Sequence, residues 1–259
     1  MADAVFDAYA RYYDLLYRDK DYAGEAAYVA SQLRRHAPAA ASILELGCGT
    51  GGHAEHLARM GFAVRGIDQS ETMLADAAAR KASLPAQIAA RLAFAPGDVR
   101  SVRTGETYDA VVSLFHVMSY QTSDADLQAA FATAAAHLRP GGLFLFDFWY
   151  GPAVLAQRPE LRVRRLEDER IHVTRIAEPT MHAADGVVDV RYTVFIEDKE
   201  SGSIRQVNET HRMRYLSLSE LATLRGAVFE ERASRAWMSE DPPGPESWAA
   251  FQVLARVAD

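Results

Sequence analysis

Short apolar runs alternate with helical patterns through the middle of this chain of 259 residues. Five runs predict buried strands and lie at 43–46, 63–67, 92–95, 109–114 and 143–148. Continuous apolar runs of this length are typical of parallel strands that are covered on both faces. Because helical patterns separate the runs, their order predicts a doubly wound α/β sheet with right-handed crossovers.

Capping signals support the helices between these runs. Ser70 can cap one helix, and Ser123 with Asp126 forms a capping box at the start of another. The sequence RPGG at 139–142 is expected to end that second helix. An earlier helix is predicted by apolar residues at helical spacing, which are Ala26, Val29, Ala30 and Leu33.

Beyond residue 148 the pattern changes to alternating, β-branched segments. Turn sequences separate these segments, so they predict an antiparallel sheet, with strands at 170–179, 186–198 and 203–216. Ser217 and Glu220 form a capping box for one later helix. The last two strands are predicted at 227–234 and 248–257. No repeat or low-complexity linker interrupts the chain, so the second half is expected to elaborate one domain.

Composition narrows the class of protein. Apolar residues make up 49% of the chain, and no run of about 18 of them predicts a membrane span. The N-terminus lacks the basic and apolar regions of a secretory signal, so a cytoplasmic protein is expected. Cys48 is the single cysteine, and His53 and His56 lack an evident third ligand, so neither a disulfide nor a metal is expected. A net charge of −7 without a basic stripe argues against nucleic acid as a partner.

A glycine-rich turn follows the first predicted strand. Gly47, Gly49 and Gly52 satisfy the pattern G-x-G-x-x-G, and Asp68 follows the second strand about 20 residues later. Such a turn presents backbone N–H groups to a ligand, and the acid holds ribose hydroxyls. Dinucleotides and other adenosine ligands both use this geometry, so the turn by itself leaves an NAD(P)-dependent oxidoreductase open.

Two further acids favour a cationic adenosine ligand over a dinucleotide. Glu45 lies in the strand just before Gly47, where a carboxylate would repel an anionic pyrophosphate. Asp98 ends the third strand, where a carboxylate can accept a hydrogen bond from an adenine amino group.

Five motifs of the chain resemble those of the class I S-adenosylmethionine-dependent methyltransferases, in the order ELGCGTGG, GIDQSETML, GDV, YDAVVSLF and LRPGG. They cover residues 40–148. The resemblance implies S-adenosyl-L-methionine as the cofactor. It also implies a Rossmann-like sheet of seven strands whose last strand, here 248–257, runs antiparallel to the rest.

The same resemblance implies where the cofactor binds. Gly47 and Gly49 would pack against the methionine moiety, and Asp68 would hold the ribose hydroxyls. Glu45 is added to these contacts for its charge, and Phe115 for its place after the fourth strand. The expected cofactor contacts are Glu45, Gly47, Gly49, Asp68, Gln69, Met73, Asp98, Val99, Leu114 and Phe115.

The N-terminal sequence YDLLYRDKDYAGEA is similar to that of small-molecule N-methyltransferases that act on amino sugars of nucleotide-linked antibiotics and surface glycans. In that subgroup a Tyr-rich N-terminal helix closes over the cofactor, and an antiparallel sheet is inserted after the fifth strand. The resemblance implies that Tyr17 and Tyr22 reach the cofactor's carboxylate end. Some members carry a histidine where Tyr120 stands here, which leaves the identity of the base open.

Four segments are expected on this basis: a helical cap over 1–42, a cofactor-binding core over 43–150, an inserted antiparallel sheet over 151–216, and the completion of the core sheet over 217–259. The inserted sheet is expected to be either a substrate lid or the interface of a homodimer.

Ligands of open α/β sheets bind beyond the carboxyl ends of the strands, which selects the residues after the fourth and fifth strands. A histidine is a usable base near neutral pH, so His116 is the leading candidate, with Asp147 and Tyr120 as the others. Candidate contacts with the substrate are Phe148, Trp149, Tyr150, His211 and Arg212.

The expected function is methyl transfer to a small polar acceptor, namely an amine of a sugar or nucleotide-sugar. Three alternatives stand beside it: O-methyl transfer to another small metabolite, an NAD(P)-dependent oxidoreductase, and a non-catalytic module that binds the cofactor.

Overall fold

The computed structural model describes residues 15–17 and 20–257, which gather in two compact units. The core unit holds Tyr22–Gln157 and the chain from Arg214 onward, and the sheet unit holds Arg158–Met213 with the described residues before Tyr22. The boundary expected at residue 42 does not coincide with a boundary between the units, because helix α2 (Tyr22–His36) packs in the core unit.

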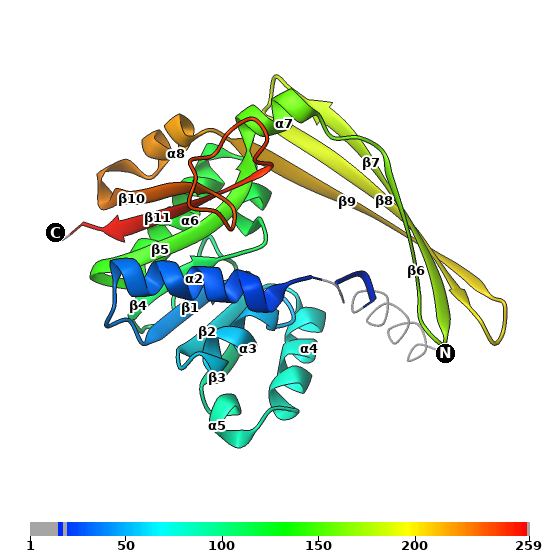
Figure 1. The fold of residues 1–259 in the computed structure, drawn as a ribbon, viewed down its shortest axis with the longest axis horizontal. Coiled ribbons are helices and arrows are strands. Elements are labelled where there is room, and N and C mark those ends of the chain that lie inside the picture. The colour runs from blue at the N-terminus through cyan, green and yellow to red at the C-terminus, as the bar shows by residue number, and fades with distance from the viewer. Residues whose placement is uncertain (1–14, 18–19, 258–259) are drawn as a thin grey trace. The chain divides into compact units, whose positions relative to one another are not determined.

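The core unit is built on a sheet whose strands follow the order β3-β2-β1-β4-β5-β11-β10 (Figure 1). Strands β1 to β5 run parallel, whereas β11 runs antiparallel to both β5 and β10. The expected fold class is therefore confirmed, including the reversed last strand. The strands are β1 (Ser42–Leu46), β2 (Ala63–Asp68), β3 (Leu92–Pro96), β4 (Tyr108–Ser113), β5 (Leu138–Tyr150), β10 (Phe229–Ala236) and β11 (Ala249–Arg256).

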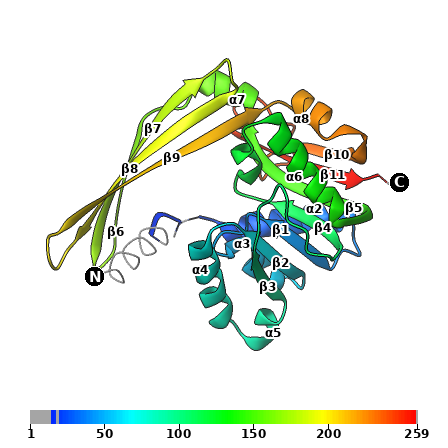
Figure 2. The ribbon, with the colours of Figure 1, turned by 180° about the vertical axis from the view of Figure 1, so that it is seen from behind.

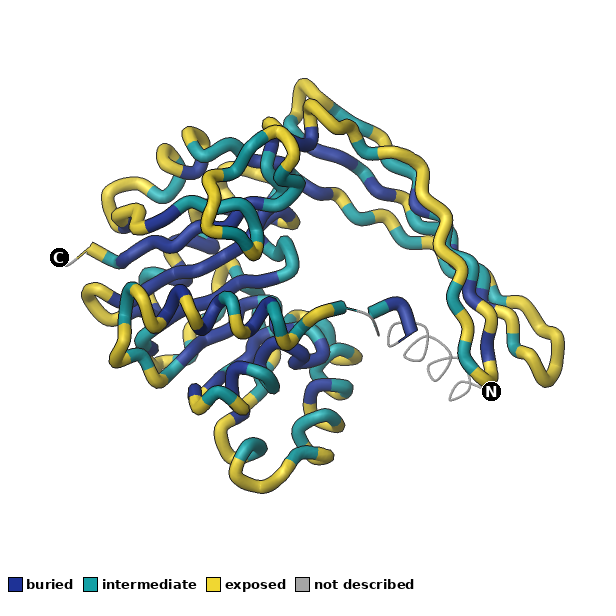
Figure 3. The backbone as a smooth tube through the Cα atoms, in the orientation of Figure 1, coloured by how far each residue is buried: buried dark blue, intermediate teal, exposed yellow. Residues whose placement is uncertain are grey.

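Helices cover both faces of this sheet (Figure 2). On one face α2 and α3 (Gly52–Arg59) bury their apolar residues against β1. On the other face α6 (Asp124–Ala136) and α8 (Leu218–Leu224) do the same. Burial on both faces explains why the central strands are mainly apolar runs, and Figure 3 shows β1, β4 and β11 mostly buried. The remaining helical segments are α4 (Glu71–Ala82), α5 (Ala86–Ala89), α7 (Gly151–Gln157), η1 (Val117–Tyr120) and η2 (Gly226–Val228).

The predicted capping residues start their helices. The Ser70 hydroxyl accepts a hydrogen bond from the N–H of Met73 at the start of α4, and the Ser123 hydroxyl accepts one from Asp126 in α6. Ser217 and Glu220 form a reciprocal capping box at α8. Each cap satisfies N–H groups that have no partner inside the helix.

The expectation that RPGG ends a helix is wrong in detail. Helix α6 ends at Ala136, and residues 139–142 belong to β5. Gly141 has a φ of 78°, and the register of β5 against β4 shifts in this stretch. Pro and Gly are tolerated at the start of a strand that contains such an irregularity, so the motif begins a strand here.

The sheet unit consists of an antiparallel sheet in the order β9-β8-β7-β6, as expected for the inserted segment. Its strands are β6 (Arg162–Glu167), β7 (Ile171–His182), β8 (Val187–Asp198) and β9 (Ile204–Leu216). The sequence did not predict strand β6. Its arginine-rich residues are mostly exposed, so the segment shows no clear alternation of apolar and polar positions. Leu15 and Leu16 pack with β7 and β8 in a small apolar cluster. Residues 1–14 and 18–19, which hold part of the expected Tyr-rich segment, lie outside the described residues.

Candidate active site

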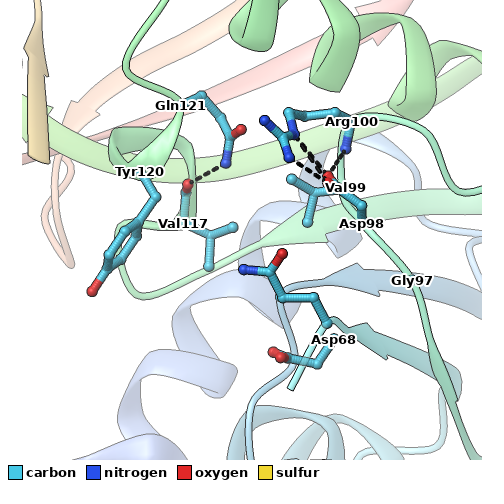
Figure 4. A pocket seen from close by; sticks show the side chains of 10 residues that line it. Asp68, Gly97, Asp98, Val99, Arg100, Val117, Tyr120 and Gln121 are labelled. Atoms are coloured by element: carbon cyan, nitrogen blue, oxygen red, sulfur yellow. Dashed lines mark hydrogen bonds and ion pairs between the residues drawn. The ribbon is translucent and has the colours of Figure 1, made fainter. Parts of the chain in front are cut away.

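A pocket of about 400 Å³ opens beyond the carboxyl ends of the parallel strands (Figure 4). It brings together residues that follow β1, β2, β3 and β4, as the rule for open α/β sheets requires. Its lining consists of Gly47, Asp68, Gln69, Gly97, Asp98, Val99, Arg100, Val117, Tyr120 and Gln121. Sequence reasoning missed Gly97, Arg100, Val117 and Gln121, although all four follow strand ends that the same rule selects.

The glycine loop and Asp68 form one hydrogen-bonded unit at this pocket. One Asp68 carboxylate oxygen accepts a hydrogen bond of 2.8 Å from the Gly49 N–H, and the other accepts one of 2.9 Å from the Ser70 N–H. Gly47 has a φ of 77°, and a Cβ atom there would lie 2.6 Å from a methyl carbon of Val117. The loop therefore depends on a glycine at position 47 for both its backbone conformation and its close approach to η1.

The other end of the pocket carries a charged cluster. The Asp98 carboxylate accepts hydrogen bonds from the backbone and the guanidinium of Arg100 (Figure 4). Arg100 also pairs with Asp126 at 2.9 Å. These bonds from Arg100 hold the pKa of Asp98 below its usual value. Asp98 is thus a charged acceptor at the pocket wall, and its contact with an adenine amino group stays a prediction.

His116 and Asp147 meet at the ends of β4 and β5. The His116 N–H lies 3.2 and 3.1 Å from the two carboxylate oxygens of Asp147, and the His116 Nδ1 lies 2.6 Å from one of them. The distance from Nδ1 to the carboxylate is that of an ion pair, but the angles at this contact are not those of a hydrogen bond. Phe115 and His116 both have a φ of 64°, a conformation that non-glycine residues rarely adopt. The Asp147 carboxylate accepts from the His116 N–H and so holds this strained turn in place. Asp147 is only 1% exposed, so its carboxylate is not open to solvent.

Comparison with known proteins shows which family has this arrangement. The family described as "Methyltransferase domain" matches residues 43–142. The chain is 32% identical over 249 residues, or 95% of this chain and 90% of the relative, to dTDP-3-amino-3,6-dideoxy-alpha-D-glucopyranose N,N-dimethyltransferase of Streptomyces fradiae. A solved, S-adenosylmethionine-bound amino pentose methyltransferase of Micromonospora echinaspora is 27% identical, with a TM-score of 0.75 over 96% of both chains. The chain belongs to the S-adenosylmethionine-dependent methyltransferases.

A further relative, dTDP-3-amino-3,4,6-trideoxy-alpha-D-glucopyranose N,N-dimethyltransferase of Streptomyces venezuelae, is 39% identical over 150 residues. That alignment spans 57% of this methyltransferase and 60% of the relative. S-Adenosylmethionine is therefore the cofactor, and the NAD(P)-dependent alternative is set aside. The pocket fits this cofactor chemically, because its backbone turn and its Asp68 and Asp98 carboxylates offer polar partners to an adenosine.

The other predicted cofactor residues are not among those that line the pocket. Leu114 is buried in the core, and Met73 lies half-buried on α4. Tyr22 packs its ring edge-on against His53 and close to Gly52, so Gly52 makes room for a tyrosine rather than for a phosphate. Tyr17 belongs to the sheet unit, where its hydroxyl interacts with Arg175. Their contacts with the cofactor stay predictions.

The predicted substrate residues of the core unit differ in exposure. Phe148 is buried completely among Phe146 and its neighbours, so the structure gives it a packing role in place of the expected pocket wall. Trp149 is half-buried, its ring centroid lies 6.3 Å from that of His116, and it packs edge-on against Trp248. Tyr150 is half-buried against the core. Trp149 is thus one of two aromatic residues beside His116, the other being Phe115, whose ring centroid lies 5.6 Å from that of His116.

The two predicted substrate residues of the sheet unit have partners on their own sheet. His211 packs edge-on against the Tyr192 ring at 5.0 Å and lies 3.3 Å from the Glu209 carboxylate. Arg212 is exposed, 3.8 and 3.7 Å from the Asp185 and Asp189 carboxylates. Their contact with substrate stays a prediction.

Among residues 15–17 and 20–257, no cluster of three or more His, Cys, Asp or Glu residues is arranged to hold a metal ion. Within the same ranges, no helix is both long enough and apolar enough to cross a membrane.

Replacing Gly47 by alanine is expected to weaken S-adenosylmethionine binding at least about tenfold, because the left-handed φ costs about 1–2 kcal/mol before the contact with Val117 is counted. Calorimetric titration with the cofactor measures this loss. Gly105→Ala is the matched control, since Gly105 has a φ of 76° and open space where its Cβ atom would stand. Equal cofactor affinity of the two variants would contradict the role assigned to the contact with Val117.

Proposed function

We propose that this methyltransferase transfers methyl groups from S-adenosylmethionine to the amine of a nucleotide-linked sugar. The observation that carries the proposal is the similarity to the Streptomyces fradiae N,N-dimethyltransferase, because it extends over 95% of the chain and so includes the inserted sheet as well as the cofactor core. The similarity to the amino pentose methyltransferase has the same extent. The cytoplasmic location and the homodimer stay predictions from the sequence.

The chemistry asks little of the protein beyond alignment and proton removal. S-Adenosylmethionine supplies a methyl group on a sulfonium sulfur. The amine nitrogen forms the new N–C bond as the C–S bond breaks, and the electron pair stays on sulfur. Holding the two groups in line supplies much of the rate, because the reaction becomes effectively intramolecular. A sugar ammonium must also lose one proton, which requires a base.

His116 is the residue that we assign to proton removal. Asp147 engages its backbone N–H and lies against Nδ1, which leaves Nε2 as the ring nitrogen turned away from that carboxylate. Asp147 is then a positioning residue, because its buried carboxylate fixes the ring without touching the substrate. Tyr120 lines the pocket and is the second candidate for contact with the acceptor.

Trp149 supports an amine as the acceptor. Its ring lies beside His116, and an aromatic face attracts an ammonium by about 0.5–2 kcal/mol. The methylated amine is also a cation, whereas a methylated hydroxyl is neutral, so the contact is compatible with an amine acceptor. The preference for N-methylation over O-methylation rests on the similarity to the N,N-dimethyltransferase.

The test compares a dTDP-linked 3-amino sugar with the same sugar carrying a hydroxyl in place of the amine. We expect S-adenosylhomocysteine to form only with the amine, and mass spectrometry to show one and then two added methyl groups. Turnover on the hydroxyl compound alone would replace the proposal by O-methyl transfer. Cofactor binding without turnover on any sugar amine would favour the non-catalytic alternative.

A further inference from the structure

Three ionisable side chains form a line behind the glycine loop, on the face of the sheet that α2 and α3 cover. His53 in the first turn of α3 lies between two acids: its Nε2 is 2.6 Å from a Glu25 oxygen on α2, and its Nδ1 is 3.7 Å from a Glu45 oxygen on β1. The exposed fractions of the side chains rise from 1% for Glu45 through 5% for His53 to 12% for Glu25. The line therefore leads from the interior toward the surface.

Glu45 is the unusual member of this line. Its second carboxylate oxygen is buried and has no hydrogen-bond partner in the described residues. Burial first, and then the charge of Asp68, raise the pKa of Glu45 to about 8. Its strand neighbours, Gly66 on β2 and Val112 on β4, bring no charge. Cys48 on the loop stays neutral as well, because burial and Glu45 raise the pKa of its thiol. The fold thus favours the protonated form of the Glu45 carboxyl.

The protonation of Glu45 depends on the charges at the pocket. Asp68, whose charge acts on Glu45, lines the pocket itself, and Gly47, two residues after Glu45, does so too. Charges interact strongly across a water-poor interior, so a positive charge in the pocket favours the ionised form of Glu45. S-Adenosylmethionine carries one net positive charge, whereas its product S-adenosylhomocysteine is neutral overall.

We propose that Glu45, connected to the surface through His53 and Glu25, is the group that distinguishes the charged cofactor from its neutral product, by giving up a proton when the cofactor binds and taking one back after methyl transfer. The proton on the Glu45 oxygen passes to solvent by way of His53 and Glu25, and the same route returns it. This transfer of a proton forms and breaks no covalent bond in the cofactor. The inference needs only cofactor binding, so it is independent of the proposed sugar substrate.

The test counts protons by calorimetric titration in two buffers of different ionisation enthalpy, near pH 7.5. The wild-type protein is expected to release more protons on binding S-adenosylmethionine than on binding S-adenosylhomocysteine. Glu45→Gln is expected to remove that difference and to lower the preference for S-adenosylmethionine over S-adenosylhomocysteine about tenfold, which corresponds to a shift of about one pKa unit at a coupled group. Equal proton release for the two ligands in the wild type would overturn the proposal.

Thermal unfolding gives a second readout that needs no ligand. An acid whose pKa is raised in the folded state binds more protons folded than unfolded between about pH 4.5 and 8, so stability falls as pH rises through this window. Relative to the wild type, the Tm of Glu45→Gln should therefore increase from about pH 5 to about pH 8.5, by at least about 2–4 °C. A Tm difference independent of pH would contradict the protonated state of Glu45.

Glu25→Gln tests the connection to the surface with a less buried residue. It keeps the size of the side chain and removes its charge, so it is expected to slow the release of the proton after S-adenosylmethionine binds, as followed by stopped flow with a pH indicator. Glu55→Gln is the matched control, because Glu55 lies on the same helix as His53 and pairs with Arg59 and Arg80 outside this line. An identical rate of proton release for Glu25→Gln and the wild type would exclude Glu25 from the exchange.

Discussion

Replacing His116 by alanine is expected to lower kcat about 100- to 10,000-fold on a sugar amine, the usual contribution of a positioned base. Cofactor affinity should change much less, because His116 does not line the pocket of about 400 Å³. Steady-state kinetics with a dTDP-linked amino sugar and calorimetry with S-adenosylmethionine separate the two effects. His172→Ala is the control, since His172 is an exposed histidine on β7 with no assigned role.

Asp147→Asn adds a test of positioning. The amide keeps the size of the side chain, but it cannot accept from the His116 N–H at both of its terminal atoms. We expect a smaller loss of kcat than for His116→Ala, with the KM for the sugar and the affinity for the cofactor nearly unchanged. A merely structural defect would lower the Tm and both of these affinities as well. Wild-type turnover of His116→Ala would remove His116 as the base and leave Tyr120 as the candidate to test.

Asp68→Ala is expected to weaken the binding of S-adenosylmethionine by roughly 10- to 150-fold. Hydrogen bonds to a charged group contribute about 1.5–3 kcal/mol, and the variant loses the proposed ribose acceptor. It also frees the Gly49 N–H that Asp68 now holds at 2.8 Å, which loosens the loop. S-Adenosylhomocysteine should lose affinity by a similar factor, since it carries the same ribose.

Ser70→Ala is the control for Asp68. Ser70 caps α4 beside Asp68, so its loss should lower stability by about 0.5–2 kcal/mol without removing a ligand contact. A calorimetric comparison of the two variants distinguishes a weakened helix from a lost ribose contact. Unchanged cofactor affinity in Asp68→Ala would show that Asp68 does not hold the ribose. The common loss for both ligands also separates Asp68 from Glu45, whose replacement should affect mainly S-adenosylmethionine.

Local patterns in the sequence determined the framework of this protein. The mainly apolar runs at 43–46 and 63–67 are strands because both faces of the sheet are covered, and Glu45 and Arg65 are the polar exceptions along them. The glycine loop and Asp68 share the pocket because both follow the ends of neighbouring parallel strands. Caps such as Ser70 are likewise local, since a hydroxyl satisfies an N–H only three residues away.

The tertiary structure decided which side chains meet. Nothing in the spacing of His116 and Asp147 foretells their contact, because it depends on β4 and β5 lying side by side. Phe148 looked like a pocket residue, yet the alternation of β5 turns it into the core. Arg100 donates a hydrogen bond to the Asp98 carboxylate because the turn after β3 brings the two side chains together. No sequence pattern predicted the shape of that turn.

Glu45 shows most clearly the difference between what the sequence determined and what the tertiary structure decided. Its position just before the glycine loop fixed its nearness to the cofactor, and its charge pointed to a cationic ligand. Its protonation depends on how completely α2 and α3 exclude water and on the distances to His53 and Asp68. The sequence alone determined which residues follow which strand, because apolar runs, turn residues and helix caps are local patterns. Contacts, burial and charge states were decided only by the packed fold, because they depend on residues far apart in the chain.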